Sequence, residues 1–289
     1  MPQTINTNIA SLNAQRNLNS SQSSLATSMQ RLSSGLRVNS AKDDAAGLAI
    51  AERMNAQARG MSVAMRNAND GISLAQTAEG ALGKVADSLQ RMRELAIQAR
   101  NATNADSDKD SLDKEFGELA KEIQRVTAGT TFNGKYILGQ DAALPQTFQV
   151  GPNTTSNDEI TVTTPNMSAD TTITKVSGSD TSGAGRAVID RTADAAAIAT
   201  VVADIDTALD TVNSQRATLG ATQNRFDAVI SNLQVAYENQ TAARSRIMDA
   251  DFAVETSNLS RAQILQQAGN AMVAQANQLP QQVLSLLKG

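Results

Sequence analysis

The chain has 289 residues, with 25 Lys and Arg against 29 Asp and Glu, which gives a net charge of −4. It has no histidine, cysteine or tryptophan, and aromatic residues make up only 2% of it. These absences exclude disulfides, thiol nucleophiles and Ser-His-Asp catalysis, and they remove the usual transition-metal ligands. A mildly acidic chain without a basic run also disfavours nucleic-acid binding.

The N-terminus lacks the basic start, the unbroken apolar stretch and the small-residue cleavage site of a secretory signal peptide. No segment approaches the roughly 18 apolar residues that span a bilayer. We therefore expect no membrane insertion. If the chain leaves the cell, we expect a route that cleaves no leader.

Near the N-terminus, apolar residues at alternating steps of three and four predict a helix buried along one seam. Its seam positions are Leu18, Leu25, Met29, Leu32 and Leu36. The surrounding sequence is rich in Asn, Gln and Ser, so such a helix would be marginal on its own in water. Two interpretations remain open: a surface helix of a monomer, or a segment that orders only when subunits assemble.

Three further seams predict the helices of a rod. The first contains Leu74, Ala78, Leu82, Val85, Leu89, Met92 and Ala96; the second contains Leu112, Phe116, Leu119, Ile123 and Val126; the third runs from Ile198 through Ile205 and Leu209 to Tyr237. Polar Arg216 and Gln223 interrupt the third seam. Asp110 and Ser111 are expected to cap the helix of the second seam.

A different composition separates the second and third of these helices. Asn133-Gly134 predicts a hairpin turn. Beyond it, Thr-rich β-type runs lie among prolines, which predicts a small set of β-hairpins from Tyr136 to about Val176. Gly178–Gly185 is expected to be a flexible loop. The whole insert covers about residues 136–186.

The last seam lies in a polar segment at the C-terminus, where Pro280 is expected to end or bend the helix. Its positions include Leu265, Met272, Leu279, Val283 and Leu286. The predicted fold is mainly α, with long antiparallel helices forming a coiled-coil rod and a β-hairpin insert between the N- and C-terminal halves. Residues 1–43 with 251–289 would form a terminal coiled coil, disordered in the monomer. Residues 44–250 would form the rod, without a large outer domain.

The candidates for chemistry are weak. The paired carboxylates at Asp43-Asp44, Asp158-Glu159 and Asp249/Asp251 point in different directions if helical, which favours solvated surface over an acid/base pair. The glycines at Gly129 and Gly183–Gly185 lack the Lys-Ser/Thr ending of a phosphate loop. We expect no catalytic residues, no metal and no cofactor.

The residues at both ends resemble bacterial flagellin. The resemblance lies in Asn6–Leu18, Arg31–Met54, Asn69–Leu82, Ala242–Gly269 and Ala274–Leu287. It covers roughly residues 1–140 and 205–289. It implies a subunit that polymerises with other flagellins into an extracellular filament for motility. The terminal segments of the family pair as a coiled coil, which here would use the first and last seams.

The family also implies partners: filament cap and hook-junction proteins, an export chaperone at the C-terminus, and the type III export channel. In animals the family is recognised by a Toll-like receptor through the rod. The positions that match this recognition patch are Leu89, Gln90, Arg91, Glu94, Leu95 and Glu115. Two alternatives remain: a hook–filament junction protein of the same flagellum and, from another class, a secreted enzyme or effector.

Overall fold

The computed structural model describes the backbone of residues 7–288 and the side chains of residues 7–278. Its helices are α1 (Ile9–Ser34), α2 (Ala45–Ala99), α3 (Asp106–Gly129), the short α4 (Thr171–Ser177), α5 (Ala195–Met248) and α6 (Phe252–Lys288). Within residues 7–288 two small antiparallel sheets accompany them, so the predicted mainly α class is confirmed.

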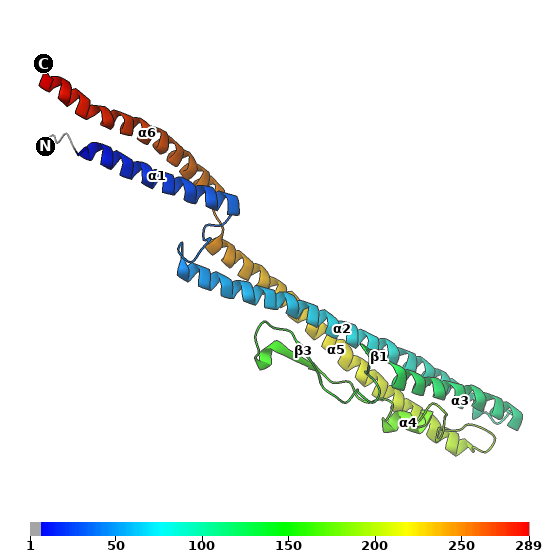
Figure 1. Ribbon diagram of the computed structural model, residues 1–289. Coiled ribbons are helices and arrows are strands. Elements are labelled where there is room, and N and C mark those ends of the chain that lie inside the picture. Colours follow the sequence, from blue (N-terminus) through cyan, green and yellow to red (C-terminus); the bar gives the residue numbers. More distant parts are fainter. Residues whose placement is uncertain (1–6, 289) are drawn as a thin grey trace. The chain divides into compact units, whose positions relative to one another are not determined.

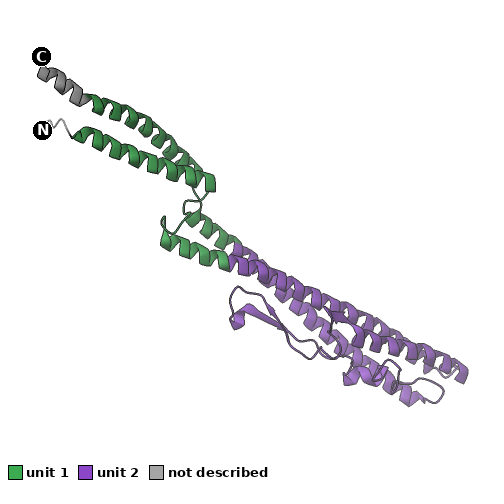
Figure 2. Cartoon of the chain, in the orientation of Figure 1, with its two compact units in different colours: residues 1–56, 238–289 green, residues 57–237 purple. Residues whose placement is uncertain are grey.

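The chain divides into two compact units (Figure 2). Unit 1 comprises residues 1–56 and 238–289, and unit 2 comprises residues 57–237. The boundary between the units falls inside α2 and α5. The breaks between α1 and α2 and between α5 and α6 fall elsewhere, at residues 35–44 and 249–251.

The core of unit 2 follows the predicted seams. All seven seam positions of α2 are buried, and Leu82, Leu89 and Met92 have no exposed surface. Phe116 and Ile123 of α3 are buried in the same cluster, as are Ile198, Ile205, Val212, Leu219 and Phe226 of α5. Tyr237 was predicted to continue the α5 seam, but its side chain is 39% exposed.

Small residues allow these helices to approach closely. Ala75, Ala78, Ala96 and Ala208 are completely buried. A Cβ placed on Gly71 would lie 2.5 Å from the Phe226 ring, so only glycine leaves room for that ring. A core with few aromatic residues is therefore filled by close helix contact rather than by large side chains.

Two helix ends differ from expectation, and a third is capped by an aspartate. α3 begins at Asp106, before the predicted cap at Asp110 and Ser111, because the Asp108 carboxylate accepts a hydrogen bond from the Ala105 N–H at 3.1 Å. The Asp44 carboxylate accepts from the Gly47 N–H at 2.8 Å at the start of α2. α6 runs past Pro280 to Lys288, so that proline does not end the helix.

The carboxylates of Asp43 and Asp251 also bind backbone near helix starts. Asp43 accepts from the N–H groups of Ser40 and Asn39, and these hydrogen bonds hold the pKa of its carboxyl below the usual value. Asp251 accepts from the Ala253 and Val254 N–H groups at the start of α6. These acidic residues therefore shape the linkers instead of forming an acid/base pair.

The insert is part sheet and part helix. β1 (Thr131–Phe132) pairs with β2 (Lys135–Tyr136) across the predicted turn, where Asn133 and Gly134 have φ of 48° and 78°. Such paired positive φ angles are those of a type I′ hairpin. β3 (Gln146–Gln149) pairs with β4 (Glu159–Val162), from Gln146 opposite Val162 to Gln149 opposite Glu159.

The predicted hairpins were wrong beyond β4. Asp170 caps α4 through the Thr172 N–H at 2.9 Å, and Ile173 and Val176 of α4 are buried in the core. Their spacing of three places both side chains on one helix face. The β-branched composition of this stretch therefore did not decide its structure.

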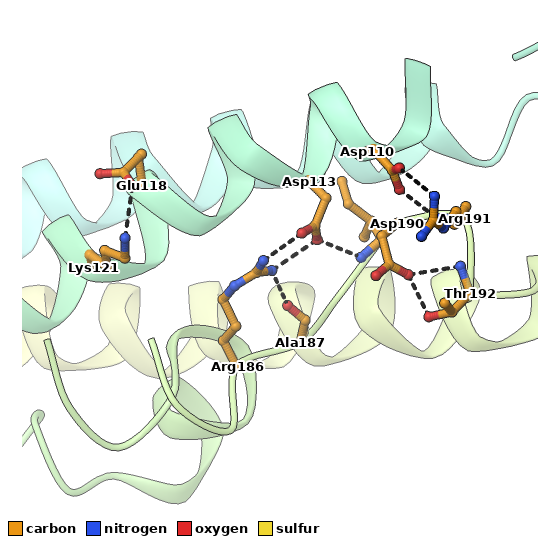
Figure 3. Close-up of polar contacts among 10 residues, drawn as sticks. Asp110, Asp113, Glu118, Lys121, Arg186, Ala187, Asp190, Arg191 and Thr192 are labelled. Atoms are coloured by element: carbon orange, nitrogen blue, oxygen red, sulfur yellow. Dashed lines mark hydrogen bonds and ion pairs between the residues drawn. The ribbon is translucent and has the colours of Figure 1, made fainter. Parts of the chain in front are cut away.

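A segment after α4, residues 186–192, runs alongside α3 and is held by aspartates of that helix (Figure 3); we call it the strap. The Arg186 guanidinium binds the Asp113 carboxylate with an Nη2–Oδ2 distance of 2.5 Å, and the Ile189 N–H donates to the same carboxylate at 3.0 Å. This ion pair is largely buried, with 17% and 13% of the two side chains exposed. Arg186 also lies 6.0 Å above the Phe116 ring.

We expect Ile205→Ala to lower the free energy of unfolding of unit 2 by about 2–5 kcal/mol, because the side chain is completely buried. Leu209→Ala should cost less, because Leu209 is only partly buried. Urea unfolding followed by circular dichroism measures both. A loss below about 0.5 kcal/mol for Ile205→Ala would contradict the burial described here.

We expect Asp113→Ala to cost about 3 kcal/mol or more, because it leaves the largely buried Arg186 charge without its carboxylate. The matched control is Arg191→Ala. Arg191 belongs to the same strap, but its pair with Asp110 is 3.4 Å long and 64% of its side chain is exposed. The control should cost less than about 1 kcal/mol. Equal losses from the two variants in urea unfolding would refute the special role of the Arg186–Asp113 pair.

Candidate functional site

The first candidate surface is the terminal helix pair, formed by α1 and α6 side by side in antiparallel orientation (Figure 1). At one end the Ser11 hydroxyl donates to the Asn277 side-chain oxygen at 2.7 Å. At the other end, an Arg31 nitrogen lies 3.8 Å from a Glu255 oxygen.

The seam of this pair contains many small and polar residues. The heptad-spaced seam positions are all buried or half-buried: Ser11, Ala14, Leu18, Ser21, Leu25, Ser28 and Leu32 on α1, and Glu255, Leu259, Ala262, Gln266, Gly269, Val273 and Ala276 on α6. Leu18 packs on Gly269, where an added Cβ would come within 3.2 Å of Leu18 Cδ1.

The seam corrects part of the predicted one. Leu18, Leu25 and Leu32 lie on it as predicted, but Met29 is 57% exposed. On α6 the seam runs one residue later than predicted, so Leu265 and Met272 are 50% and 61% exposed. The prediction followed the large apolar residues, whereas Gly269, Ala262 and Ala276 make the contact.

The other predicted positions lie elsewhere. Leu36 belongs to the linker after α1, where it packs beside Val38 and Met248. Leu279, Val283 and Leu286 lie outside the residues whose side chains the structure describes. Their assignment to the terminal coiled coil stays a prediction.

The displaced residues of α6 remain at the surface of the terminal helix pair. Leu265 and Met272, which are 50% and 61% exposed, line a groove of about 400 Å³ together with Leu18 and Gly269 among others; we call this groove the outer surface. Ile9, Leu12, Met29 and Ile264 are also at least half exposed, but they do not line this groove. Large apolar side chains exposed at a groove are typical of an interaction surface.

The two linkers next to this pair bind each other, and we call residues 35–38 with 247–250 the linker latch. The Arg37 N–H donates to the Met248 carbonyl at 2.6 Å, and the Ala250 N–H donates to the Gly35 carbonyl at 2.9 Å. The Arg37 guanidinium donates twice to the Ile247 carbonyl, at 2.7 and 3.3 Å. Because Ile247 is in the last turn of α5, this cation also satisfies an otherwise unpaired helix-end carbonyl.

A small apolar core supports the latch. Val38, Ala51 and Met248 are buried, with 2%, 1% and 5% of their surface exposed. This core joins residues of the first linker, α2 and the end of α5 within unit 1.

The second candidate surface lies on α2 and α3, where receptor recognition was predicted. Arg91 binds Glu94 one turn away and Glu115 of α3, each with an N–O distance of 2.9 Å. The hydrogen bonds to Glu115 and then to Glu94 raise the pKa of the Arg91 guanidinium. Gln90 is exposed beside them. We call these four residues the α2–α3 patch.

The two leucines predicted for the same patch are not on the surface. Leu89 and Leu95 are 0% and 1% exposed and belong to the core of unit 2. In the folded unit they lie in the core beneath the patch, and their part in receptor recognition stays a prediction.

Within the described residues, no group of three or more Asp and Glu side chains is placed to hold a metal ion. The described helices include none with the length and hydropathy needed to cross a membrane.

Comparison with known proteins identifies the family. The family model for the bacterial flagellin N-terminal helical region matches residues 5–143, and the model for the bacterial flagellin C-terminal helical region matches residues 202–287. A flagellin of Halalkalibacterium halodurans is 45% identical over 284 residues, covering 98% of this chain and 99% of that protein. A flagellin of Serratia marcescens is 44% identical over 353 aligned residues, covering both chains completely.

Among solved structures, a chain described as a flagellar hook-associated protein from Vibrio parahaemolyticus matches with a TM-score of 0.56. It is 13% identical and covers 72% of this chain and all of that chain. This likeness concerns the fold alone. The two family models and the near-full-length relatives show that the chain belongs to the bacterial flagellin family.

Proposed function

We propose that this chain is a structural subunit that polymerises with copies of itself into the extracellular filament of a bacterial flagellum, without catalytic activity. Membership of the flagellin family supports this function. The observation that carries it is the outer surface of the terminal helix pair, where Leu265 and Met272 remain exposed although they are among the larger apolar side chains of α6.

The terminal helix pair has a thin seam and an apolar exterior, and this combination suits a segment that is completed by its neighbours. Full burial of one such side chain contributes about 1.5–3 kcal/mol. Neighbouring copies that cover the outer surface would supply the stability that the Ser-rich seam does not provide. In the free monomer, residues 1–43 and 251–289 would then be disordered or only transiently helical, while the rod stays folded.

The remaining partners follow from the family. We propose that the subunit leaves the cell through the flagellar type III export channel without a cleaved leader, and that a chaperone covers its C-terminal segment beforehand. Filament cap and hook-junction proteins would contact it during assembly. The α2–α3 patch would be the surface that a host Toll-like receptor recognises, with Arg91 at its centre.

A second candidate is a hook–filament junction protein. The fold likeness to the chain described as a hook-associated protein is compatible with it. The flagellin relatives, at 44–45% identity over nearly the whole chain, favour the filament subunit.

We expect the chain to form long tubes in electron micrographs when filament fragments are added as seeds. Replacing Leu265 and Met272 together by Gln should slow elongation at least about tenfold, because central apolar contacts dominate interface energies. Gln263→Ala with Gln267→Ala, two exposed polar positions of α6, is the control and should elongate normally. Seeds that are capped without growing would favour the junction protein, and normal elongation of the Gln variant would count against the outer surface.

Hydrogen exchange should separate the two parts of the monomer. We expect residues 1–40 and 255–289 to exchange rapidly, while residues 75–125 and 198–237 are protected by the buried core of unit 2. Deleting residues 279–289 should abolish polymerisation with little change in the melting of the rod. Equal protection along the whole monomer would contradict the proposed ordering on assembly.

Arg91→Ala should abolish or strongly reduce receptor signalling while leaving the melting temperature unchanged, since its ion pairs are exposed. Arg125→Ala is the control, because Arg125 on α3 has a similar exposed pair with Glu122. A receptor-reporter assay and circular dichroism on the same monomer measure both effects. Unchanged signalling at limiting concentration would remove the α2–α3 patch as the receptor surface, and a large fall in melting temperature would make Arg91 structural.

A further inference from the structure

The seam between α1 and α6 repeats too regularly to define one register. Leu18 faces Gly269, and the same antiparallel spacing brings Leu25 to Ala262. A slip of one heptad, about 10 Å along the helix axis, would place Leu18 on Ala276 and Leu25 on Gly269. In the observed alignment Leu32 comes opposite Glu255, whereas this slip would bring it to Ala262, so apolar packing does not favour the observed alignment over the slipped one.

The polar contacts within the pair favour the observed alignment, but they are few. The Arg31–Glu255 pair is 3.8 Å long, with 31% and 8% of the two side chains exposed, and it lies four residues from Gly35 of the latch. Contacts from Asn8 to the Ala276 carbonyl and from Ser11 to Asn277 lie at the far end of the pair, where helices fray.

The linker latch has stronger contacts and a unique alignment. Two short backbone hydrogen bonds join Arg37 to Met248 and Ala250 to Gly35, and the Arg37 guanidinium adds two more on Ile247. The buried core of Val38, Ala51 and Met248 supports them. Unlike the leucine seam, these contacts have no equivalent one heptad away.

The alignment of the latch continues into the helices. Each step outward along α1 from Gly35, which pairs with Ala250, is matched by a similar step along α6. Arg31 therefore lies near Glu255, and Leu18 meets Gly269. The latch and the terminal helix pair share one continuous antiparallel register.

We propose that the linker latch sets the register of the terminal helix pair, with Arg37 as its positioning residue. The register then fixes which residues of α1 stand beside Leu265 and Met272 of α6 at the outer surface. The importance of this for polymerisation rests on the proposed function. The register itself can be measured without any filament.

Cysteine pairs provide the measurement, because the chain has no cysteine of its own. A Cβ built on Gly269 lies 3.7 Å from Leu18 Cβ, within the range that a disulfide requires. Leu18→Cys with Gly269→Cys therefore reports the native register. Leu18→Cys with Ala276→Cys, and Leu18→Cys with Ala262→Cys, report a slip of one heptad in either direction.

Each full-length monomer is equilibrated in a glutathione redox buffer, and the disulfide fraction gives an effective concentration for its pair. With the latch intact, we expect the effective concentration of the native pair to be at least about tenfold higher than that of either slipped pair. The reason is that the cysteines of the slipped pairs lie about 10 Å out of alignment. This ratio stays informative when the ends are ordered only part of the time, because the three variants have the same ends and differ only in the position of the second cysteine. Similar values for all three pairs would overturn the proposal.

A four-residue Gly-Ser spacer between Ser34 and Gly35 separates α1 from the latch and is the decisive variant. We expect it to lower the ratio to about threefold or less, because a flexible linker allows many alignments. The control is the same spacer between Thr103 and Asn104, in the α2–α3 connection. A ratio unchanged by the first spacer, or lowered equally by both, would overturn the proposal.

Arg37→Ala tests the positioning residue without an insertion. We expect it to lower the ratio several-fold, while Arg16→Ala, an exposed arginine of α1, leaves it unchanged. An unchanged ratio for Arg37→Ala would remove Arg37 from this role. Failure of the native chain to polymerise would overturn the proposed function but not the register result.

Discussion

Close contact between helices over small side chains is the constraint on which the rest of this structure depends. A chain with so few aromatic residues cannot fill wide spaces between its helices, so the helices must approach until alanine and glycine touch the opposite side chains. In unit 2, Gly71 beneath Phe226 is the clearest example. In unit 1, Gly269 beneath Leu18 follows the same rule with a smaller partner.

The two units differ in where they place their large apolar side chains. In unit 2 the small residues alternate with fully buried Leu, Met, Ile and Phe side chains, and the strap adds a buried ion pair over α3. In the terminal helix pair, three serines, one glutamate and one glutamine take seam positions, and large apolar residues such as Leu265 and Met272 are exposed. One chain thus combines a unit with a closed apolar core and a terminal helix pair that leaves large apolar side chains exposed.

The sequence predicted elements well where burial coincides with large apolar residues. The α2 seam from Leu74 to Ala96 and the Asn133-Gly134 turn are of this kind, because periodicity and turn chemistry are local signals. The α6 seam was predicted one residue out of place, because Leu265 and Met272 are apolar but exposed, whereas Gly269 is small and makes the contact.

Other features could not be predicted from the sequence because they depend on residues far apart in the chain. Arg186 and Asp113 are 73 positions apart, so no spacing rule connects them. α4 was not predicted because its β-branched residues favour a strand locally. Its helix depends on the burial of Ile173 against residues far away in the sequence. In the predicted receptor patch, the exposed charges Arg91, Glu94 and Glu115 do meet, but single-sequence reasoning placed Leu89 and Leu95 among them although the core requires both.

The latch between Gly35 and Ala250 also has a consequence for the order of folding. Joining these residues closes a loop of 214 residues, from 36 to 249. For an unfolded chain, the length-dependent part of this closure costs about 5 kcal/mol in entropy. Once α2 and α5 have packed in unit 2, most of that cost has already been met, because the two long helices return the chain toward its starting point. The latch can then close over a short distance, and pairing of α1 with α6 becomes a local zippering step. The N- and C-terminal segments are therefore expected to fold last, although the N-terminal segment is synthesised first.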